Sequence, residues 1–360
     1  MNMETIGRKI SALRKEKDMT QVELADKLGV TYQAVSSWER GNSMPDIAKL
    51  PDISQVLAVS IDELLDDAKA AGLVKNVLTG NGQAPPDLET LVEVAPILKP
   101  SQVENIAGKL NASDMQAIVD MACHLSSETL KDIILRGEGI DGDTIAAIAC
   151  YMDGEDLKEV ALHCDHLTGT TITNIACYMN SEDLKEVALH CPNIDGAAIT
   201  NIACYMNSED LKEVALHCPN IDGTTITNIA CFMNSEDLKE VALHCPSIDG
   251  ATITNIACFM DSEDLKEVAL HCPSMDGTTV TNISCHMDSE DLKEIILHSG
   301  NFDTATIANI ACHMDSEDLA EIAVKLVEAH GLKALSDSGI IMHMDEEDIA
   351  AAIARAMKKQ

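Results

Sequence analysis

The stretch SEDLKEVALHCP, Ser181–Pro192, decides the fold because the chain repeats it without change. The same twelve letters begin again at Ser208, Ser235 and Ser262, at a constant interval of 27 residues. Self-similarity at a fixed period of this size is the sequence signature of a solenoid. A cysteine keeps the same interval over eight copies, at Cys123, Cys150, Cys177, Cys204, Cys231, Cys258, Cys285 and Cys312.

Each repeat is predicted to hold two short helices. The first has one apolar face at helical spacing, formed by Ile172, Ile175, Ala176 and Met179, and the second has another, formed by Leu184, Val187, Ala188 and Cys191. Asn180 or Ser181 can cap the second helix, and Pro192 stops it. Helices of about eleven residues are marginal alone. They therefore need the neighbouring repeats, as in an α-solenoid.

The repeats are similar to the short helical-pair repeats of the HEAT-like class, in length and helix count only. The ends of the array diverge: residues 87–122 depart from the pattern, and the last copy slips to an interval of 30, from Met314 to Met344. The predicted fold class is all-α, with a small five-helix domain in residues 1–66, a linker in 67–86 and the solenoid in 87–360.

The amino-acid composition argues against several classes of function. The 360 residues carry a formal net charge of −35, which argues against a general nucleic-acid coat or an anionic-membrane binder. Apolar residues are too scattered for a membrane span of roughly 20 residues, and the start shows no signal peptide. Thirteen cysteines, an odd number with no CxxC, favour a reducing cytoplasm over a disulfide scaffold. We expect a cytoplasmic protein with no membrane partner.

Three columns of residues recur along the array. The His-Cys pairs that end the second helices, such as His190-Cys191, could bind metal or sense redox state. Because ligands in successive repeats would lie roughly 8–10 Å apart, they would not converge on one ion. We therefore interpret cysteine as a small hydrophobe and histidine as a helix-end residue, and predict no metal and no cofactor.

The second column is aromatic. Five of the seven Tyr and Phe residues of the chain follow the first-helix cysteine, at Tyr151, Tyr178, Tyr205, Phe232 and Phe259. They could stack between repeats, or form a ladder that binds a peptide or a partner helix.

The third column is acidic, with Glu182, Asp183 and Glu186 recurring. It could be a solvated face or a docking strip for a basic partner.

The N-terminal region has its own motif, TQVELADKLGVTYQAVSSWERG, Thr20–Gly41. Thr20 and Thr31 are capping residues, and Gly29 permits a tight turn between the two helices that they begin. The motif resembles the helix-turn-helix of the Xre, or phage-repressor-like, family, over about residues 6–65. Two departures are Ala58, where glycine is common, and Pro51, which predicts a late start for the fourth helix.

The resemblance implies roles for matching residues. The helix after Thr31 would enter the major groove of DNA. Arg14 and Glu39 match an internal ion pair of the family. The residues implied in DNA contacts are Thr31, Tyr32 and Gln33 at base edges, Ser36 and Ser37 one turn on, and Gln21, Arg40 and Asn42 at phosphates.

The charge is uneven. Residues 1–66 carry 8 Lys and Arg against 11 Asp and Glu, a net of −3, and the remainder carries 17 against 49, a net of −32.

No set of residues in a catalytic arrangement stands out, so we expect no enzyme activity. The leading hypothesis is a transcriptional regulator that binds an operator in double-stranded DNA as a homodimer, with a protein or peptide on the solenoid. The alternative is an interaction scaffold or anti-regulator whose DNA binding is weak or lost.

Overall fold

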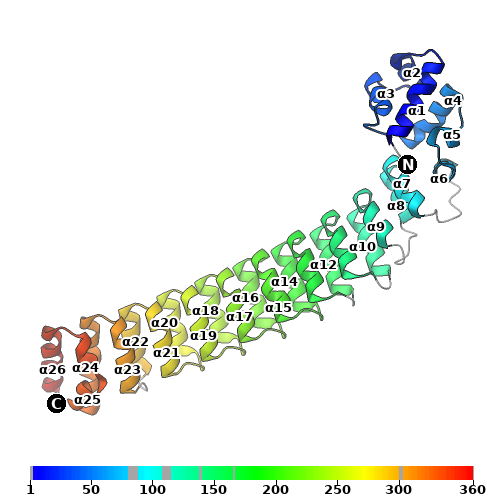
Figure 1. Cartoon of the computed structure of the whole chain (residues 1–360). Coiled ribbons are helices and arrows are strands. Elements are labelled where there is room, and N and C mark those ends of the chain that lie inside the picture. The colour runs from blue at the N-terminus through cyan, green and yellow to red at the C-terminus, as the bar shows by residue number, and fades with distance from the viewer. Residues whose placement is uncertain are drawn as a thin grey trace. The chain divides into compact units, whose positions relative to one another are not determined.

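The computed structural model describes residues 3–79, 88–107, 115–137, 140–164, 167–299 and 303–359. All regular structure in these residues is helical, and no strand occurs among them, which confirms the predicted all-α fold (Figure 1). The chain divides into two compact units, residues 1–178 and 179–360.

The first unit begins with the predicted five-helix domain. Its helices are α1 (Met3–Glu16), α2 (Gln21–Leu28), α3 (Tyr32–Glu39), α4 (Leu50–Leu57) and α5 (Ile61–Leu65), with a 3₁₀ turn η1 (Ile47–Lys49) before α4. Pro51 lies in the first turn of α4, as its position predicted. Ala58 ends α4 with φ +59°, in the left-handed region where glycine is favoured.

Residues 67–86 were predicted to form a linker, and the sequence left open whether the stretch before TGNGQAPP was a last helix. It is helical: α6 (Ala68–Thr79) packs on α5 and buries Ala70, Ala71 and Val74. Residues 80–87, which hold the Gly and Pro of the predicted tether, lie outside the described residues. The proposed domain boundaries therefore stay predictions.

The remainder of the first unit contains the first repeats. Their elements are α7 (Leu88–Val94), η2 (Ala95–Ile97), α8 (Pro100–Ala107), α9 (Met115–Met121), η4 (Ala122–His124), α10 (Ser127–Arg136), α11 (Gly142–Ile148), η5 (Ala149–Tyr151), α12 (Gly154–His163), α13 (Gly169–Ile175) and η6 (Ala176–Tyr178). The first helix of a repeat is thus shorter than expected. In α11 and α13 it ends at the isoleucine before Ala-Cys, and a 3₁₀ turn follows.

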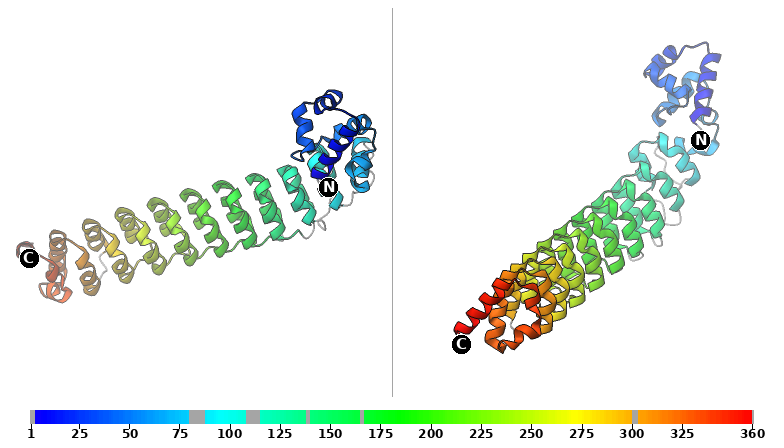
Figure 2. Two further views of the ribbon diagram at one scale, coloured as in Figure 1. Left: turned by 45° about the horizontal axis from the view of Figure 1, so that its top comes forward. Right: turned by 60° about the vertical axis from the view of Figure 1, so that its left-hand side comes forward.

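The second unit is a stack of helix pairs in chain order (Figures 1 and 2). Its second helices are α14 (Ser181–His190), α16 (Ser208–His217), α18 (Ser235–His244), α20 (Ser262–His271), α22 (Ser289–Ser299), α24 (Ser316–His330) and α26 (Glu346–Lys359). Its first helices and 3₁₀ turns are α15 (Gly196–Ile202), η7 (Ala203–Tyr205), α17 (Gly223–Ile229), η8 (Ala230–Phe232), α19 (Gly250–Ile256), η9 (Ala257–Phe259), α21 (Gly277–Ile283), η10 (Ser284–His286), α23 (Thr304–Ile310), η11 (Ala311–His313), α25 (Lys333–Ser338) and η12 (Ile340–His343).

The apolar faces predicted from the spacing form the core of the stack. First helices pack on first helices and second helices on second helices. Leu211, Val214, Ala215 and Cys218 of one repeat are all buried, and the same positions are buried in the next repeats. Each face is therefore covered by a near-identical copy of itself.

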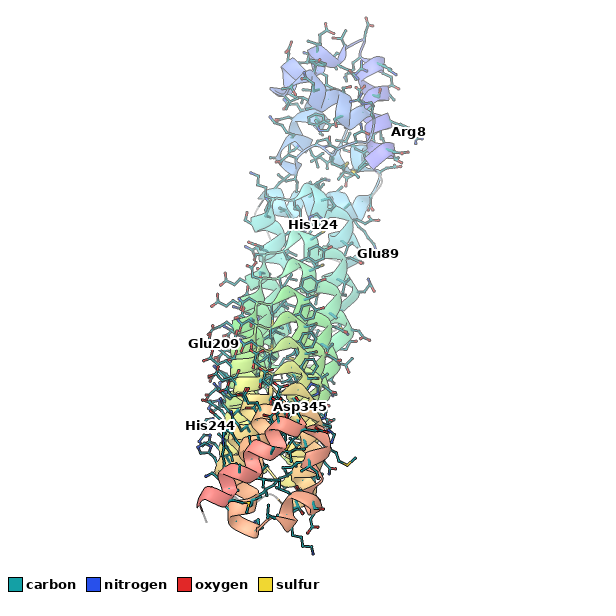
Figure 3. All side chains as sticks on the ribbon, turned by 90° about the vertical axis from the view of Figure 1, so that its left-hand side faces the viewer. Arg8, Glu89, His124, Glu209, His244 and Asp345 are labelled. Atoms are coloured by element: carbon teal, nitrogen blue, oxygen red, sulfur yellow. The ribbon has the colours of Figure 1, made fainter. Side chains whose placement is uncertain are left out.

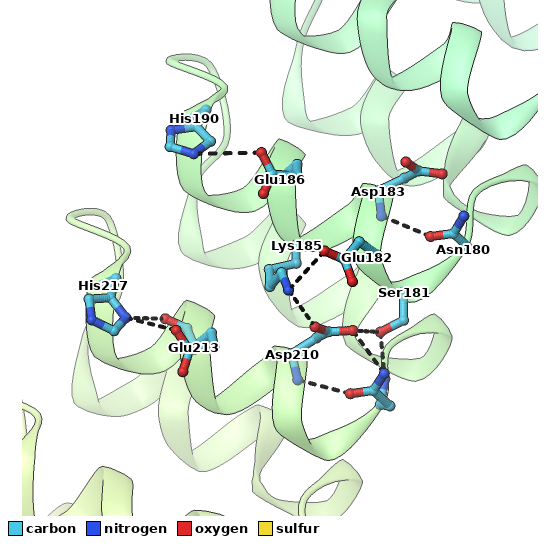
Figure 4. Close-up of polar contacts among 11 residues, drawn as sticks. Asn180, Ser181, Glu182, Asp183, Lys185, Glu186, His190, Asp210, Glu213 and His217 are labelled. Atoms are coloured by element: carbon cyan, nitrogen blue, oxygen red, sulfur yellow. Dashed lines mark hydrogen bonds and ion pairs between the residues drawn. The ribbon is translucent and has the colours of Figure 1, made fainter.

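A polar clamp joins successive second helices, as α14 and α16 show (Figure 4). The Ser181 hydroxyl donates to the Asp210 carboxylate at 2.5 Å and accepts from the backbone N–H of Asn207 at 2.9 Å. Lys185 Nζ lies 2.9 Å from the other oxygen of Asp210. Asn207 also caps α16 by accepting the backbone N–H of Asp210. One carboxylate is thus held from both sides.

The same clamp recurs along the stack. Its further copies in the second unit are Ser208–Asp237–Lys212, Ser235–Asp264–Lys239, Ser262–Asp291–Lys266 and Ser289–Asp318–Lys293. The first unit has Ser127–Asp156–Lys131. Burial acts to raise the pKa of each of these aspartates, but the hydrogen bonds from lysine and serine outweigh it and lower the pKa.

The clamp predicts that Asp264→Asn lowers the free energy of unfolding, and that the size of this effect depends on pH. At neutral pH the variant loses a charge-assisted hydrogen-bond acceptor, and we expect about 1.5–3 kcal/mol less stability to urea, followed by circular dichroism. A carboxylate with a lowered folded-state pKa stabilises the fold above its unfolded pKa of about 3.9 and loses this effect as the pH falls. The difference in stability between the wild type and Asp264→Asn should therefore shrink towards pH 3. Glu263→Gln, at the exposed neighbour, is the control and should change little.

Candidate nucleic-acid interface

Two capped helices form the centre of the N-terminal domain. Thr20 and Glu23 form a reciprocal capping box at the start of α2, and Gly29 ends α2 with φ +65°. Thr31 caps α3 by accepting the backbone N–H of Ala34 at 3.2 Å. Val35 and Trp38 then point into the core. The sequence signals for this turn and for both helix starts are confirmed.

A buried ion pair fixes α3 against α1. Arg14 donates two hydrogen bonds to the Glu39 carboxylate, at 2.5 and 2.9 Å, and a third to the backbone oxygen of Met19. Both side chains are about nine-tenths buried. Ser11 and Gln21 also donate to Glu39. Burial acts to raise the pKa of Glu39, but these hydrogen bonds outweigh it, so its pKa is lowered.

α1 also approaches the end of α3 closely. A Cβ on Gly7 would lie 2.1 Å from the carbonyl oxygen of Trp38, so no larger residue fits there without a shift. Together with the Arg14–Glu39 pair, this contact holds the far end of α3 in place. The first turn of α3 is therefore carried on a rigid frame.

That first turn is exposed. Thr31, Tyr32 and Gln33 all present their side chains to solvent, and Tyr32 is 53% exposed. Four residues further on, Ser36 and Ser37 are half-buried, and the Ser37 hydroxyl accepts a hydrogen bond from Ser43 at 2.7 Å. These five predicted base-contact positions lie on one helix, with the most accessible ones at its N-terminal end.

The three predicted phosphate contacts lie in different surroundings. Arg40 and Asn42 are exposed just after α3. Gln21, at the start of α2, is half-buried and donates to Glu39 at 2.8 Å. Its amide therefore links the start of α2 to the end of α3, a contact that the resemblance alone did not reveal.

Four of the eight Lys and Arg side chains in residues 1–66 pair with acids of the same domain. Arg8 pairs with Glu4, Lys9 with Asp66 and Lys49 with Asp52, while Arg14 is buried. Within the described residues, Lys15, Lys17, Lys27 and Arg40 form no ion pair. In α1 and the turn after it, Lys15 and Lys17 are therefore the cations left to contact phosphates.

In the repeats, the five aromatic side chains of the column are exposed. Tyr151 and Tyr178 in the first unit are 46% and 43% exposed. Tyr205, Phe232 and Phe259 in the second unit are 47%, 41% and 40% exposed. Each ends a 3₁₀ turn beside an exposed cysteine. The rings thus leave a large part of their surface available.

The other two columns divide between core and surface. Cys218 is buried and its thiol donates to the backbone oxygen of Ala188 in the preceding repeat, at 3.3 Å, which agrees with a small core residue. The histidines that precede such cysteines are exposed, as His244 shows on the same outer edge as Glu209 (Figure 3). In the acidic column, Glu182 and its equivalents are exposed, whereas the aspartates at the Asp210 position are held in the clamps from Asp210 to Asp318.

Potential metal ligands do not cluster in the described part of the chain. All thirteen cysteines are free, and no set of three or more His, Cys, Asp or Glu side chains there is arranged to hold a metal ion. Over the same residues, no helix combines the length and the apolar character needed to cross a bilayer.

Comparison with known proteins agrees with this geometry. Residues 10–64 match the family model described as helix-turn-helix. The chain is 41% identical over 69 residues to the uncharacterized transcriptional regulator YazB of Bacillus subtilis, and it covers all of that protein. It is 38% identical over 91 residues to the transcriptional regulator SinR of Bacillus subtilis, covering 76% of it.

The chain belongs to the helix-turn-helix family of transcriptional regulators. The matches to YazB and SinR lie within 19% and 25% of this chain. Other relatives are longer: the chain spans 45% of YqaE of Bacillus subtilis and 28% of the transcriptional activator BcrR of Enterococcus faecalis. The structure of ComR from Streptococcus suis aligns with 99% of this chain at 14% identity, but the TM-score of 0.18 supports no conclusion.

The buried Arg14–Glu39 ion pair predicts that Glu39→Gln destabilises the helix-turn-helix domain. It leaves the Arg14 guanidinium buried without its counter-charge, which typically costs about 3–5 kcal/mol. Trp38 is the single tryptophan and is buried in this domain, so its fluorescence in urea follows this domain alone. Glu16→Gln, exposed on α1, is the control. Equal midpoints for the two variants would contradict the role given to the pair.

Proposed function

We propose that this chain is a sequence-specific DNA-binding transcriptional regulator, not an enzyme, and that its acidic repeats bind a protein or peptide partner. The exposed first turn of α3 is the observation that supports DNA binding. Thr31, Tyr32 and Gln33 project there from a helix that is fixed at its other end by Arg14 and Glu39. In this family of folds, that end of the helix faces base edges in the major groove.

The side chains offered at this turn suit base recognition. A glutamine can form two hydrogen bonds to the N6 and N7 atoms of adenine. Threonine and tyrosine add a methyl group, a ring and hydroxyl groups beside it. Arg40 and Asn42 would contact phosphates on one side, with Lys15, Lys17 and Lys27 as further unpaired cations.

The repeats suit a different partner. Residues 67–360, with a net charge of −32, repel DNA, so the ligand of the repeats is expected to be a protein or peptide. The exposed ladder of Tyr205, Phe232 and Phe259 supports this, because exposed aromatic residues in a regular row are typical of binding surfaces. Tyr151 and Tyr178 carry the same feature in the first unit.

A second candidate is favoured by the charge of the N-terminal domain. With a net of −3 and several of its cations paired to its own acids, this domain has few charges for phosphates. In that case the repeats would be the working part of an interaction scaffold or anti-regulator, and DNA binding would be weak or lost.

Gln33→Ala separates the two candidates. Duplexes are first selected from a random pool with the full-length chain, and their affinity is then measured by fluorescence anisotropy at fixed salt. We expect the variant to bind the selected duplex about 10–100-fold more weakly and to lose preference at one A·T pair, because a bidentate contact is worth about 1–3 kcal/mol.

Gln55→Ala, an exposed glutamine on α4, is the matched control and should bind as the wild type does. Failure to enrich any duplex at low salt would contradict operator binding and favour the scaffold. Selected duplexes that bind Gln33→Ala unchanged would contradict the assigned recognition turn.

The partner surface is tested by the triple variant Tyr205→Ala, Phe232→Ala and Phe259→Ala. Peptides selected from a displayed library on the wild-type chain should bind the triple variant at least about tenfold more weakly, because truncated aromatic anchors usually cost more than 1 kcal/mol. Glu209→Gln with Glu236→Gln and Glu263→Gln is the control on the acidic column. Loss of binding only in this control would assign the partner to the acidic column instead.

A further inference from the structure

The first helices of the second unit carry a stripe of exposed residues along one side. In α17 and the turn η8, Asn228, Cys231 and Phe232 are all exposed, three and four residues apart, and therefore share one helical face. An asparagine stands four residues before the aromatic or histidine residue of the column in five successive repeats. These asparagines, all exposed, are Asn201, Asn228, Asn255, Asn282 and Asn309.

The side-chain amides of these five asparagines are uncommitted. In the described part of the second unit, none of them forms a hydrogen bond with another residue. Other asparagines of the repeats are engaged: the Asn207 amide donates to the Asp210 carboxylate at 2.8 Å, and the Asn220 amide donates to the backbone oxygen of Ile194 at 3.0 Å. Each of these five repeats therefore offers one free amide, with two donor hydrogens and an acceptor, one helical turn from the column.

The asparagine keeps its place where its neighbours change. Around Asn282, Val280, Ser284 and His286 all differ from the residues one repeat earlier, and around Asn309 the helix changes again. Asparagine is also a poorer helix former than alanine, lysine or glutamate, so helix stability does not explain its presence. The row of amides is therefore suited to an external hydrogen-bonding partner.

The spacing of the rows selects the backbone conformation of such a partner. Stacked helices lie roughly 8–10 Å apart, so equivalent side chains recur at that interval. A polyproline II helix has three residues per turn and rises about 3.1 Å per residue, so the same face returns after about 9.3 Å. In a β-strand the same face returns after two residues, or about 6.7 Å. One turn of polyproline II, and not one period of a strand, matches one repeat.

A partner helix would also place an anchor at each repeat, since seven residues of an α-helix rise about 10.5 Å. The free amides argue against a helix, because the backbone N–H and C=O groups of a helix are already bonded to one another. A polyproline II segment has no internal hydrogen bonds, so its carbonyl groups are free to accept from the asparagines. Exposed aromatic rings are also the surface on which proline-rich segments dock.

We propose that the second unit binds an extended, proline-rich and basic segment of a partner protein, with one polyproline II turn per repeat. Proline rings pack on Tyr205, Phe232 and Phe259, and the amides of the asparagine row donate to the carbonyl groups of the segment. The net charge of −32 on residues 67–360 favours a segment that carries Arg or Lys. This inference rests on the proposed partner binding by the repeats and names the chemistry of that partner.

Fluorescence anisotropy with the full-length chain tests the asparagine row. The probe is a labelled peptide of five Pro-Pro-Arg triplets at fixed salt. We expect saturable binding that Asn201→Ala, Asn228→Ala and Asn255→Ala together weaken at least about tenfold, because three hydrogen bonds are lost at once. These side chains are exposed and unbonded in the described structure, so the urea midpoint should not change. His217→Ala with His244→Ala, exposed on the second helices, is the matched control and should bind as the wild type does.

Three further probes separate conformation from charge. Five Gly-Gly-Arg triplets carry the same charge on a flexible chain, and we expect them to bind at least about tenfold more weakly. A helical peptide with the same number of arginines should also bind more weakly. An oligothymidine, whose bases can stack on rings, should not bind because the repeats are acidic. Equal binding of the glycine peptide, tighter binding of the helix or the oligothymidine, or an unchanged affinity of the asparagine variant would overturn the proposal.

Failure of this inference is distinguishable from failure of the proposed function. No binding of the Pro-Pro-Arg peptide at about 1 mM would overturn the inference, since this concentration detects even weak complexes. If peptides from the displayed library still bind the wild type and not the triple aromatic variant, the proposed function stands while the polyproline II partner is wrong. If the library yields no ligand either, both are wrong.

Discussion

The carboxylate that each repeat presents to the repeat before it is the constraint on which the array depends. Apolar faces of Leu, Val, Ile and Ala attract one another without specifying register, since such contacts are non-directional. The Asp210 carboxylate is directional: it accepts from Ser181 and from Lys185 at fixed positions on the neighbouring helix. A helix that slipped by one turn would keep much of its apolar contact but leave a largely buried charge without its donors.

The N-terminal domain uses the same kind of device once. Glu39 is a largely buried carboxylate that collects Arg14, Ser11 and Gln21, and it fixes the end of α3 opposite the exposed turn. Rigid support at one end leaves the other free to offer Thr31, Tyr32 and Gln33. In both parts of the chain, buried polar contacts set geometry and apolar contacts supply most of the driving force.

Much of this was predictable from the sequence. The 27-residue period and the two apolar faces were sufficient for the helical array, and the capping threonines with Gly29 were sufficient for the helix-turn-helix. The clamp was missed because Asp210 and its equivalents directly follow a glutamate in sequence, and a periodic pattern does not show which of the two acids turns inward. The fixed separation of 29 residues between Ser181 and Asp210 was a usable signal. The 3₁₀ turn at Ala203–Tyr205 was also missed, because Ala-Cys continues the helical spacing of the isoleucines. The contact of Gly7 with Trp38 depends on a helix crossing that composition cannot reveal.

The identity of successive clamps has a consequence for inheritance. Recombination between the codons for Ser208 and Ser235 would remove 27 residues and rejoin a serine to the same Glu-Asp-Leu-Lys that it had before. Every donor would still meet an acceptor, and the two ends of the array would be unchanged. The gene can therefore lengthen or shorten its aromatic ladder in whole steps without inventing a new interface, so natural strains are free to differ in ladder length while sharing one architecture.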